Sequence, residues 1–402
     1  MSCWPRYPTF YETNTWVWLA ELSRKAGGNV DLGSVDRAEW DAIAALGFDA
    51  VWLMGVWERS PAGIAVANKN SRLQQTFRRE LPDYRPEDNV GSPYCIRRYK
   101  VDAHLGGPDG LARARNHLAD RGLRLVLDFV PNHVAPDHPW VMEHPEYFIQ
   151  GSGDDLATDP VSYMNVNGTA IACGKDPYFP AWPDVLQLNA FHPGLRSAAE
   201  RTVSIPASEY WIDLIGGIKR SHPEFFFCIA EAYWDLEWEL QQQGFAFCYD
   251  KRLYDRLEHD NAGSVRLHLC ADQVYQNRLL RFLENHDEQR AASAFSPAKQ
   301  RAAALITYAL PGARLFHEGQ FEGRKIWLPV FLARRPEEPL DRAIQEFYQK
   351  LLLTIARPAF KEGDWTLCES SGWPDNPTHE NIVACSWKKG DERYLIIVRP
   401  ER

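Results

Sequence analysis

The sequence predicts an α/β fold, a barrel of parallel strands alternating with helices, and three observations support this prediction. Short apolar runs alternate with longer helical patterns along most of the chain, as in repeated βα units. Several of these runs end abruptly in carboxylates, amides and histidines, as barrel strands do at a functional face. The length of 402 residues suits one barrel with additions, and a hydrophobic content of 45% is enough for a large core.

The predicted elements follow from these patterns in chain order. Seven apolar runs predict barrel strands at residues 14–19, 48–54, 123–130, 225–232, 245–249, 279–284 and 313–317. Periodic segments predict helices at residues 36–46, 109–121, 193–203, 208–222, 235–243, 297–310 and 341–356. The pair Ser296-Pro297 is a typical helix start, with a capping hydroxyl followed by proline in the first turn.

Three segments depart from the βα pattern. Residues 65–100 are rich in charge and proline and predict a long loop. Residues 137–189 combine prolines and aromatic residues without a helical period, which predicts a loop-rich insertion after the third strand. From about residue 363 short strands alternate, so the expected domains are residues 1–136 (first part of the barrel), 137–189 (insertion), 190–360 (second part of the barrel) and 361–402 (truncated β domain).

The spacing between residues 189 and 225 indicates an incomplete barrel. Only 225 − 189 = 36 residues separate the end of the insertion from the next predicted strand. A helix, a strand and a second helix belong there, and at about 30 residues for each βα unit they need about 60. The two predicted helices follow each other directly, with no apolar run ending in aspartate between them. We therefore expect the fourth barrel strand to be absent.

The amino-acid composition limits the classes of partner that this protein is expected to bind. The net charge of −9 argues against nucleic acid and against an anionic membrane surface. Fifteen Trp and 16 Tyr are consistent with core packing or with a sugar-stacking cleft. The eight cysteines form no CxxC pair, and Cys228, Cys248 and Cys270 lie in apolar runs, which predicts buried thiols in a reducing compartment. Because the sequence shows neither a leader nor an apolar run near 18 residues, we expect a soluble, cytoplasmic protein.

The polar strand ends supply the candidate site residues. Glu231 follows a long apolar run, so apolar surroundings should raise its pKa and suit it to act as a general acid. A salt-bridged structural glutamate is the alternative. Asp287 beside His286 could bind sugar hydroxyls or stabilise a cationic transition state, and a helix cap is the alternative there. Asp128 and His133 could bind hydroxyls or a cation, or be structural.

Five segments, taken in order, resemble the α-amylase family of glycoside hydrolases. Residues 128–133, 230–231 and 284–287 resemble the first, third and fourth signature regions of the family. Residues 182–189 resemble the segment that closes its inserted domain, and residues 311–319 resemble the run through its eighth strand. The resemblance extends almost from end to end and implies a TIM-type (β/α)8 barrel, incomplete here.

The resemblance also implies roles and partners. Glu231 would be the general acid/base and Asp287 the carboxylate that stabilises the transition state. His133 and His286 would bind hydroxyls in the cleavage subsite, with Asp128 and Tyr94 as further substrate-binding residues. Asn132 corresponds to a residue that helps to bind a structural calcium ion in many members, so calcium is a possible cofactor. The partner would be an α-glucan or a small α-glucoside.

One departure from the family concerns the catalytic nucleophile. The second signature region supplies the nucleophilic aspartate and an arginine two residues before it, and no such run occurs between residues 189 and 225. Asp213, the only aspartate there, lies in a helical pattern and receives no role. The C-terminal β unit is also shorter than the third domain of the family.

Four hypotheses about function follow from the sequence. The first is a retaining glycosidase or transglycosidase acting on α-glucosidic bonds, inactive or impaired in this chain. The second is a non-catalytic carbohydrate-binding or regulatory barrel, and the third is a defective product of an internal deletion. The fourth is an unrelated barrel enzyme that uses Glu231 and Asp287 as an inverting pair.

Overall fold

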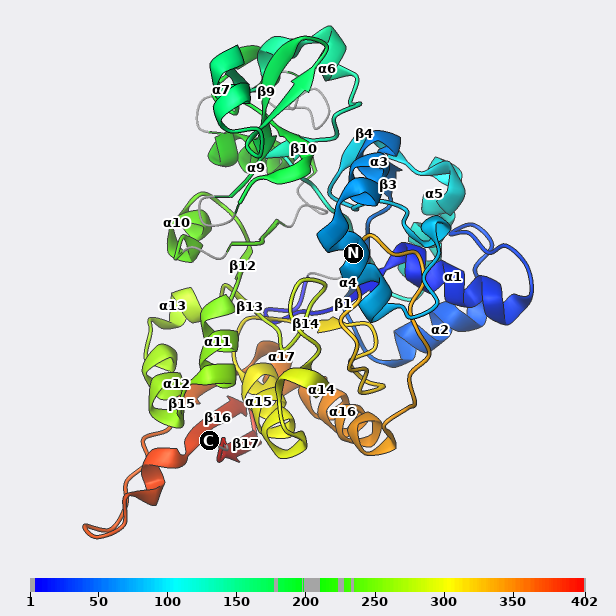
Figure 1. Cartoon of the computed structure of the whole chain (residues 1–402). Coiled ribbons are helices and arrows are strands. Elements are labelled where there is room, and N and C mark those ends of the chain that lie inside the picture. Colours follow the sequence, from blue (N-terminus) through cyan, green and yellow to red (C-terminus); the bar gives the residue numbers. More distant parts are fainter. Residues whose placement is uncertain are drawn as a thin grey trace.

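A curled sheet of seven parallel strands forms the centre of the molecule (Figure 1). The computed structural model describes residues 4–176, 180–196, 198, 210–222, 228–232 and 235–400. The strand order is β11-β12-β13-β14-β1-β2-β5, and every neighbouring pair is parallel. The strands are β1 (Thr9–Asn14), β2 (Ala50–Met54), β5 (Arg124–Val126), β11 (Ile229–Ala230), β12 (Phe247–Tyr249), β13 (Leu279–Arg281) and β14 (Ala313–His317).

The sheet is open between its two ends, β5 and β11. Among the residues that the structure describes, the sheet has seven strands, as predicted, and no strand joins these two. The absence of a fourth barrel strand stays a prediction, because residues 199–209 and 223–227 lie outside the described part. Residues 197, 199–209, 223–227 and 233–234 are outside the described part. The predicted helix at 193–203 and the beginning of the predicted strand at 225–232 therefore fall largely outside it.

The first strand lies before its predicted position. Residues 14–19 were expected to be a strand, but β1 is Thr9–Asn14 and the helix α1 (Thr15–Ala26) begins directly after it. The Asn14 side chain caps this helix by accepting a hydrogen bond from the Val17 amide, and Gly27 ends it in the left-handed region with φ 69°. The aromatic and β-branched residues of this run favour a strand locally, but the cap and the burial of Leu19 and Leu22 along one face favour the helix.

The other predicted helices of the barrel are present within a few residues. They are α2 (Arg37–Ala45), α5 (Gly107–Ala119), α9 (Tyr210–Ser221), α10 (Glu237–Gln242), α15 (Pro297–Ala309) and α16 (Arg342–Ile355). Ser296 caps α15 through the Lys299 amide, as the sequence predicts. Further helices are α11 (Lys251–His259), α12 (Ala262–Leu269), α13 (Gln273–Gln276), α14 (Ala291–Ala294) and α17 (Pro358–Glu362), with the 3-10 turn η2 (Ala103–Leu105).

The predicted long loop at residues 65–100 is wrong for most of its length. It contains the end of α3 (Pro61–Lys69), then α4 (Ser71–Glu80), the 3-10 turn η1 (Pro86–Asp88) and most of β4 (Ile96–Val101), which pairs with β3 (Trp57–Arg59). Ser60 and Asn70 cap the two helices through their side-chain oxygens. The apolar period is hard to see in α4 because Phe77 is its only fully buried side chain.

The insertion is a small domain with its own sheet rather than an irregular loop. Its strands are β6 (His133–Val134), β7 (Gln150–Gly151), β8 (Tyr163–Val166), β9 (Thr169–Gly174) and β10 (Trp182–Gln187), all paired antiparallel. They are accompanied by α6 (Trp140–Glu143), η3 (Pro145–Tyr147) and α7 (Gly153–Thr158). A separate apolar cluster that includes Val134, Ile171 and Leu186 supports it. Short strands of this kind give little periodic signal in a sequence.

A three-stranded antiparallel sheet closes the chain. It consists of β15 (Asp364–Leu367), β16 (Val383–Lys389) and β17 (Glu392–Val398), with η4 (Pro377–Asn381) before β16. Trp387 anchors it against the barrel: the ring is buried, and its Nε1 donates a hydrogen bond of 2.6 Å to the Ala309 carbonyl at the end of α15. This is the small C-terminal β domain that the sequence predicts.

Two further expectations concern the burial of the cysteines and the presence of a membrane-spanning helix. Every cysteine within the described residues is a free thiol. Cys248 is buried and Cys228 partly so, but Cys270 is exposed because it follows the end of α12, which contradicts its predicted burial. In the described part of the chain, none of the helices has the length and apolar character needed to cross a membrane.

Candidate functional site

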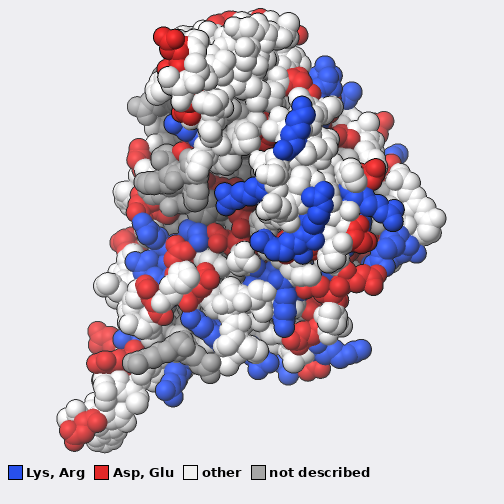
Figure 2. Space-filling view, viewed as in Figure 1, with Lys and Arg blue, Asp and Glu red and all other residues white. Residues whose placement is uncertain are grey.

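A single large cleft lies at the carboxyl ends of the barrel strands. Its volume is about 2720 Å³, and it extends from the inserted domain into the barrel, where Phe10, Leu280 and Leu315 also line it. Figure 2 shows the molecule from the side on which this face is hollowed, with acidic side chains inside the hollow. All seven of the predicted site residues line this cleft: Tyr94, Asp128, Asn132, His133, Glu231, His286 and Asp287.

His286 lies at the centre of the site, in the loop after β13. Its side chain is buried, and the Tyr94 hydroxyl lies 2.7 Å from its Nε2. The same Nε2 is 3.4 Å from Asp287 Oδ2 and 3.7 Å from Glu231 Oε1. Burial lowers the pKa of His286, but Asp287 and Glu12 raise it, and the result is a pKa well above the usual value. His286 is therefore the positive centre of an acidic site.

Glu12, at the end of β1, is a site residue that sequence reasoning missed. Its Oε1 lies 2.6 Å from His286 Nδ1, and its Oε2 lies 3.1 Å from His317 Nδ1. Burial raises the pKa of Glu12, but the charges of His317 and His286 lower it further, to about 2. The signal was present, since Glu12-Thr13-Asn14 is a polar strand end like the others, but the misplaced first strand concealed it.

Glu231 and Asp287 face the same space, although Glu231 is less enclosed than expected. The Glu231 side chain is 35% exposed, so the predicted apolar burial is wrong, because β11 ends at the open edge of the sheet. Asp287 is about half exposed; burial raises its pKa, but the charge and hydrogen bond of His286 keep it below the usual value. The nearest side-chain atoms of Glu231, His286 and Asp287 all lie within 4.8 Å of one another, so the three side chains share one space in the cleft.

Asp128, which follows β5, is tied to the barrel. Its Oδ1 accepts a hydrogen bond of 2.9 Å from Trp52 Nε1, and its Oδ2 accepts one of 2.6 Å from the Gly55 amide. Burial raises the pKa of Asp128, although these two hydrogen bonds and the charge of His286 oppose the rise. With both oxygens already bound, Asp128 is positioned to accept further hydrogen bonds at its free lone pairs but is a poor candidate nucleophile.

His133 and Asn132 border the cleft on the inserted domain. Burial lowers the pKa of His133 to about 4, so the imidazole is neutral at pH 7. The Asn132 Oδ1 accepts a hydrogen bond of 2.8 Å from Gln187 Nε2, and its Nδ2 donates to the Lys175 carbonyl. Calcium requires six to eight oxygen ligands. Because the Asn132 amide is occupied by protein groups, this donor set does not fit a calcium ion.

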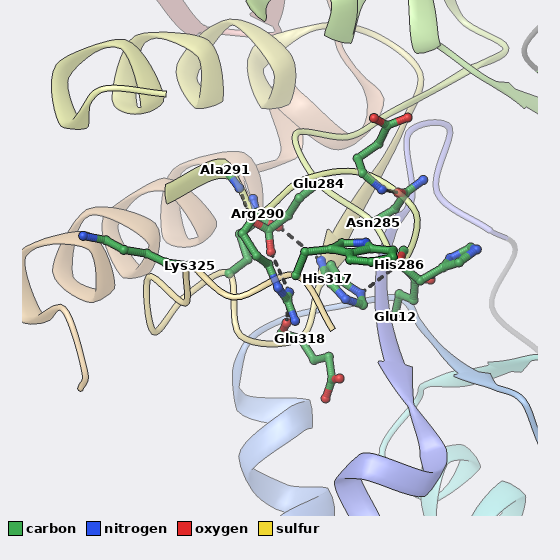
Figure 3. A network of polar contacts seen from close by, with 12 residues as sticks. Glu12, Glu284, Asn285, His286, Arg290, Ala291, His317, Glu318 and Lys325 are labelled. Carbon is green, nitrogen blue, oxygen red and sulfur yellow. Dashed lines mark hydrogen bonds and ion pairs between the residues drawn. The ribbon is translucent and has the colours of Figure 1, made fainter. Parts of the chain in front are cut away.

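Two buried groups fix the loop that carries His286 and Asp287. Arg290 Nη1 donates hydrogen bonds to Glu284 Oε1 at 2.9 Å and to the Glu318 carbonyl at 2.6 Å. The second oxygen of Glu284 accepts from the Ala291 amide at 2.7 Å (Figure 3). The loop between residues 284 and 291 is thus held at both ends.

Carboxylates on neighbouring parts of the cleft wall are already paired. Glu288 contacts Lys251 at 3.1 Å, and Asp235 pairs with Arg252. A curled parallel sheet with carboxylates and histidines at its carboxyl ends, opening into a large cleft, is the arrangement of a barrel protein whose site lies at its strand ends.

Comparison with known proteins shows which proteins this chain is similar to. The family model described as "Alpha amylase, catalytic domain" matches residues 32–163. Solved structures with the same fold include an α-amylase from Lactobacillus plantarum, with a TM-score of 0.69 and 20% identity over 98% of this chain and 88% of that one. A maltogenic α-amylase from Thermotoga neapolitana has a TM-score of 0.68 and 18% identity over 98% and 86%. The chain thus has the fold of these α-amylases, and residues 32–163 match the catalytic-domain model of that family.

Similar curated proteins are transferases. An α-1,4-glucan:maltose-1-phosphate maltosyltransferase from Bifidobacterium longum is 25% identical over 250 residues, which are 54% of this chain and 29% of the relative. One from Streptomyces coelicolor is 28% identical over 206 residues, covering 48% and 27%. The chain thus spans less than a third of the length of the curated relatives that it matches.

Proposed function

We propose that the cleft binds an α-glucan or a small α-glucoside, and that this chain is an α-amylase-like glycosidase or transglycosidase whose catalysis is absent or severely impaired. One observation carries the proposal. Glu231, His286 and Asp287 meet at the strand ends, as a glycosidase site requires, while the sheet is open between β5 and β11 within the described residues. That opening is where the family resemblance places the nucleophile.

The residues present support part of a retaining mechanism. Glu231 reaches into the cleft from β11 and is placed to donate a proton to a leaving oxygen. Asp287, kept ionised beside His286, is placed to favour positive charge on the sugar ring. His286 is placed to donate a hydrogen bond to a sugar hydroxyl, and the rings of Trp52 and Tyr94 supply flat surfaces in the cleft for a pyranose.

The missing step is the covalent one. A retaining enzyme divides one difficult displacement into two through a glycosyl intermediate, and neither step proceeds without a nucleophile. In another hydrolase, loss of one member of a catalytic set costs roughly 10⁴–10⁶ in rate. We expect a loss on this scale relative to an intact member of the family. The fourth hypothesis, an inverting pair, is disfavoured, because carboxyl groups in such pairs stand about 6.5–9.5 Å apart, whereas oxygens of Glu231 and Asp287 lie within 4.8 Å.

The test is an assay with an activated α-glucoside that carries a good leaving group, with and without azide. Azide can take the place of a missing nucleophile, so we expect turnover to rise when it is added and to remain near background without it. Glu231→Gln should abolish the azide-dependent turnover if the leaving group still needs a proton. Glu87→Gln, which removes an exposed carboxylate on η1, is the matched control. Robust turnover without azide that requires Glu231 would overturn the proposed impairment.

A carbohydrate-binding or regulatory barrel is the second candidate. The size of the cleft and its aromatic lining favour it, since sugar binding requires the walls of the site and not the nucleophile. Calorimetry with maltotriose would distinguish the two: binding without any turnover, even with azide, supports the non-catalytic protein. The curated relatives are named for maltosyl transfer from maltose 1-phosphate. Whether this chain uses the same donor can be tested by offering it maltose 1-phosphate with an α-1,4-glucan acceptor.

A further inference from the structure

We propose that Glu12 is a positioning residue for the cleft: its buried carboxylate holds the His286 ring in one orientation and keeps it protonated, so that Nε2–H is directed at the bound sugar. This inference rests on the proposed sugar-binding function. It concerns a residue at the end of β1 that contacts the cleft only through His286.

The first argument is the burial of Glu12. Its side chain has no exposure to solvent, and moving an isolated carboxylate into such a site costs several kcal/mol. The charge is tolerable only with a cationic or strongly donating partner. His286 provides one at 2.6 Å on Oε1, and His317 lies 3.1 Å from Oε2 (Figure 3). Both oxygens therefore face imidazoles.

The second argument is the register of the central strands. Glu12 on β1 is paired with His317 on β14 on one side and with Trp52 on β2 on the other. The Glu318 amide donates to the Glu12 carbonyl at 2.9 Å, which fixes the main chain at this point. The carboxylate thus belongs to a strand that is paired on both sides, whereas His286 belongs to the loop after β13.

The third argument is the surroundings of the opposite nitrogen. Titratable groups face His286 from every adjoining element: Glu12 from β1, His317 from β14, Glu231 from β11, Asp287 from its own loop, and Tyr94 and Asp128 from the far wall. The carboxylates outnumber the cations. With Nδ1–H bound to Glu12, Nε2 hydrogen-bonds the Tyr94 hydroxyl at 2.7 Å and faces Glu231 and Asp287 in the cleft, where a sugar hydroxyl would compete for it.

A variant of Glu12 can test the charge of His286 separately from the orientation of its ring. In Glu12→Gln the amide oxygen can still accept from Nδ1–H, while the negative charge is lost. We expect the pKa of His286 to fall by at least about one unit, because an opposite charge at this distance typically shifts a pKa by about 1–3 units. A smaller fraction of the ring would then be protonated at pH 8, and hydrogen-bond donation from Nε2 would weaken.

The experiment combines histidine titration with sugar binding. In ¹⁵N-histidine-labelled wild-type protein, the His286 ring should remain protonated at pH 8, with its resonance assigned from His286→Gln. Glu12→Gln should lower maltotriose affinity by roughly 10- to 100-fold at pH 8, the scale of one charged hydrogen bond, and by much less at pH 5, where the ring is protonated without help. The matched control is Glu318→Gln, which removes an equally buried carboxylate that pairs with Arg335 and should leave the His286 titration unchanged.

Each outcome decides something. A wild-type His286 that titrates at or below the ordinary value of about 6.5 overturns the proposal, and this measurement remains available if Glu12→Gln does not fold. An affinity loss that is equal at pH 5 and pH 8 also overturns it, because that result indicates a purely structural effect. If His286 titrates as expected but wild-type protein binds no α-glucan, the control of His286 by Glu12 is supported and the proposed function fails.

Discussion

The buried pair Glu284–Arg290 offers a sharp test of how the site loop is held. Arg290→Met removes the guanidinium that binds Glu284 Oε1 at 2.9 Å and the Glu318 carbonyl at 2.6 Å, and Met fills much of the same volume. Both partners are almost inaccessible to solvent, so the variant leaves the Glu284 carboxylate buried with only the Ala291 amide as donor.

The magnitude follows from that uncompensated charge. Breaking a buried ion pair by removing one partner costs about 3–5 kcal/mol, most of it the penalty for the charge left behind. The double variant Glu284→Gln/Arg290→Met should recover part of this loss, because it removes the orphaned charge. The exposed pair Arg24–Glu337 is a matched control: its N–O distance is 2.8 Å, but its side chains are 64% and 83% exposed. Arg24→Met should therefore cost about 0–1 kcal/mol.

The assay is urea unfolding at pH 7, followed by intrinsic Trp fluorescence, with maltotriose affinity measured on each folded variant. Arg290→Met should also weaken sugar binding, because the loop from 284 to 291 carries His286 and Asp287. A loss of stability no larger for Arg290→Met than for Arg24→Met would refute the reasoning, since burial would then not control the strength of these pairs.

Two further predictions concern acid stability and the open edge of the sheet. Because the pKa of Glu12 falls from its ordinary value of 4.5 to about 2 on folding, its contribution is present above pH 4.5 and is lost as the pH falls through about 2. Over this range the free energy of unfolding should drop by up to about 3 kcal/mol more for wild type than for Glu12→Gln in urea titrations, since other buried carboxylates such as Glu318 lose their contribution in both proteins; parallel curves would contradict this. Hydrogen exchange should be at least about tenfold faster in β5 and β11 than in β1 and β14, because each edge strand is paired on one side only. Strong protection of both edge strands would show that the gap is sealed.

Local patterns in the sequence were sufficient to predict most strands and helices of the barrel. Two strands, at residues 48–54 and 313–317, and the helix that starts at Ser296 could be predicted from local sequence. A strand buried on both faces is a continuous apolar run, and a helix cap is a capping residue directly before the helix, so both can be read from neighbouring residues. The 36 residues between positions 189 and 225 predict that the fourth strand is absent, and in the described residues the sheet is open between β5 and β11.

Other features depended on contacts that no local pattern contains. The first strand was misplaced because Trp16, Val17 and Trp18 favour a strand locally, while the Asn14 cap favours a helix. The sheet of the inserted domain was missed because its strands have six residues or fewer and pair across the domain. The enclosure of Glu231 was overestimated, since an apolar run does not show that the strand lies at an open edge.

The sequence by itself determined the order of barrel elements, the gap and the polar strand ends, because the period of side-chain burial and the length of each connection are properties of neighbouring residues. Only the tertiary structure decided that Glu12, 274 residues away from His286 along the chain, lies 2.6 Å from its ring. The physical reason is that the pairing of β1 with β14 and the position of the loop after β13 set this distance. The carboxylate that binds Nδ1 of this imidazole thus comes from a distant part of the chain.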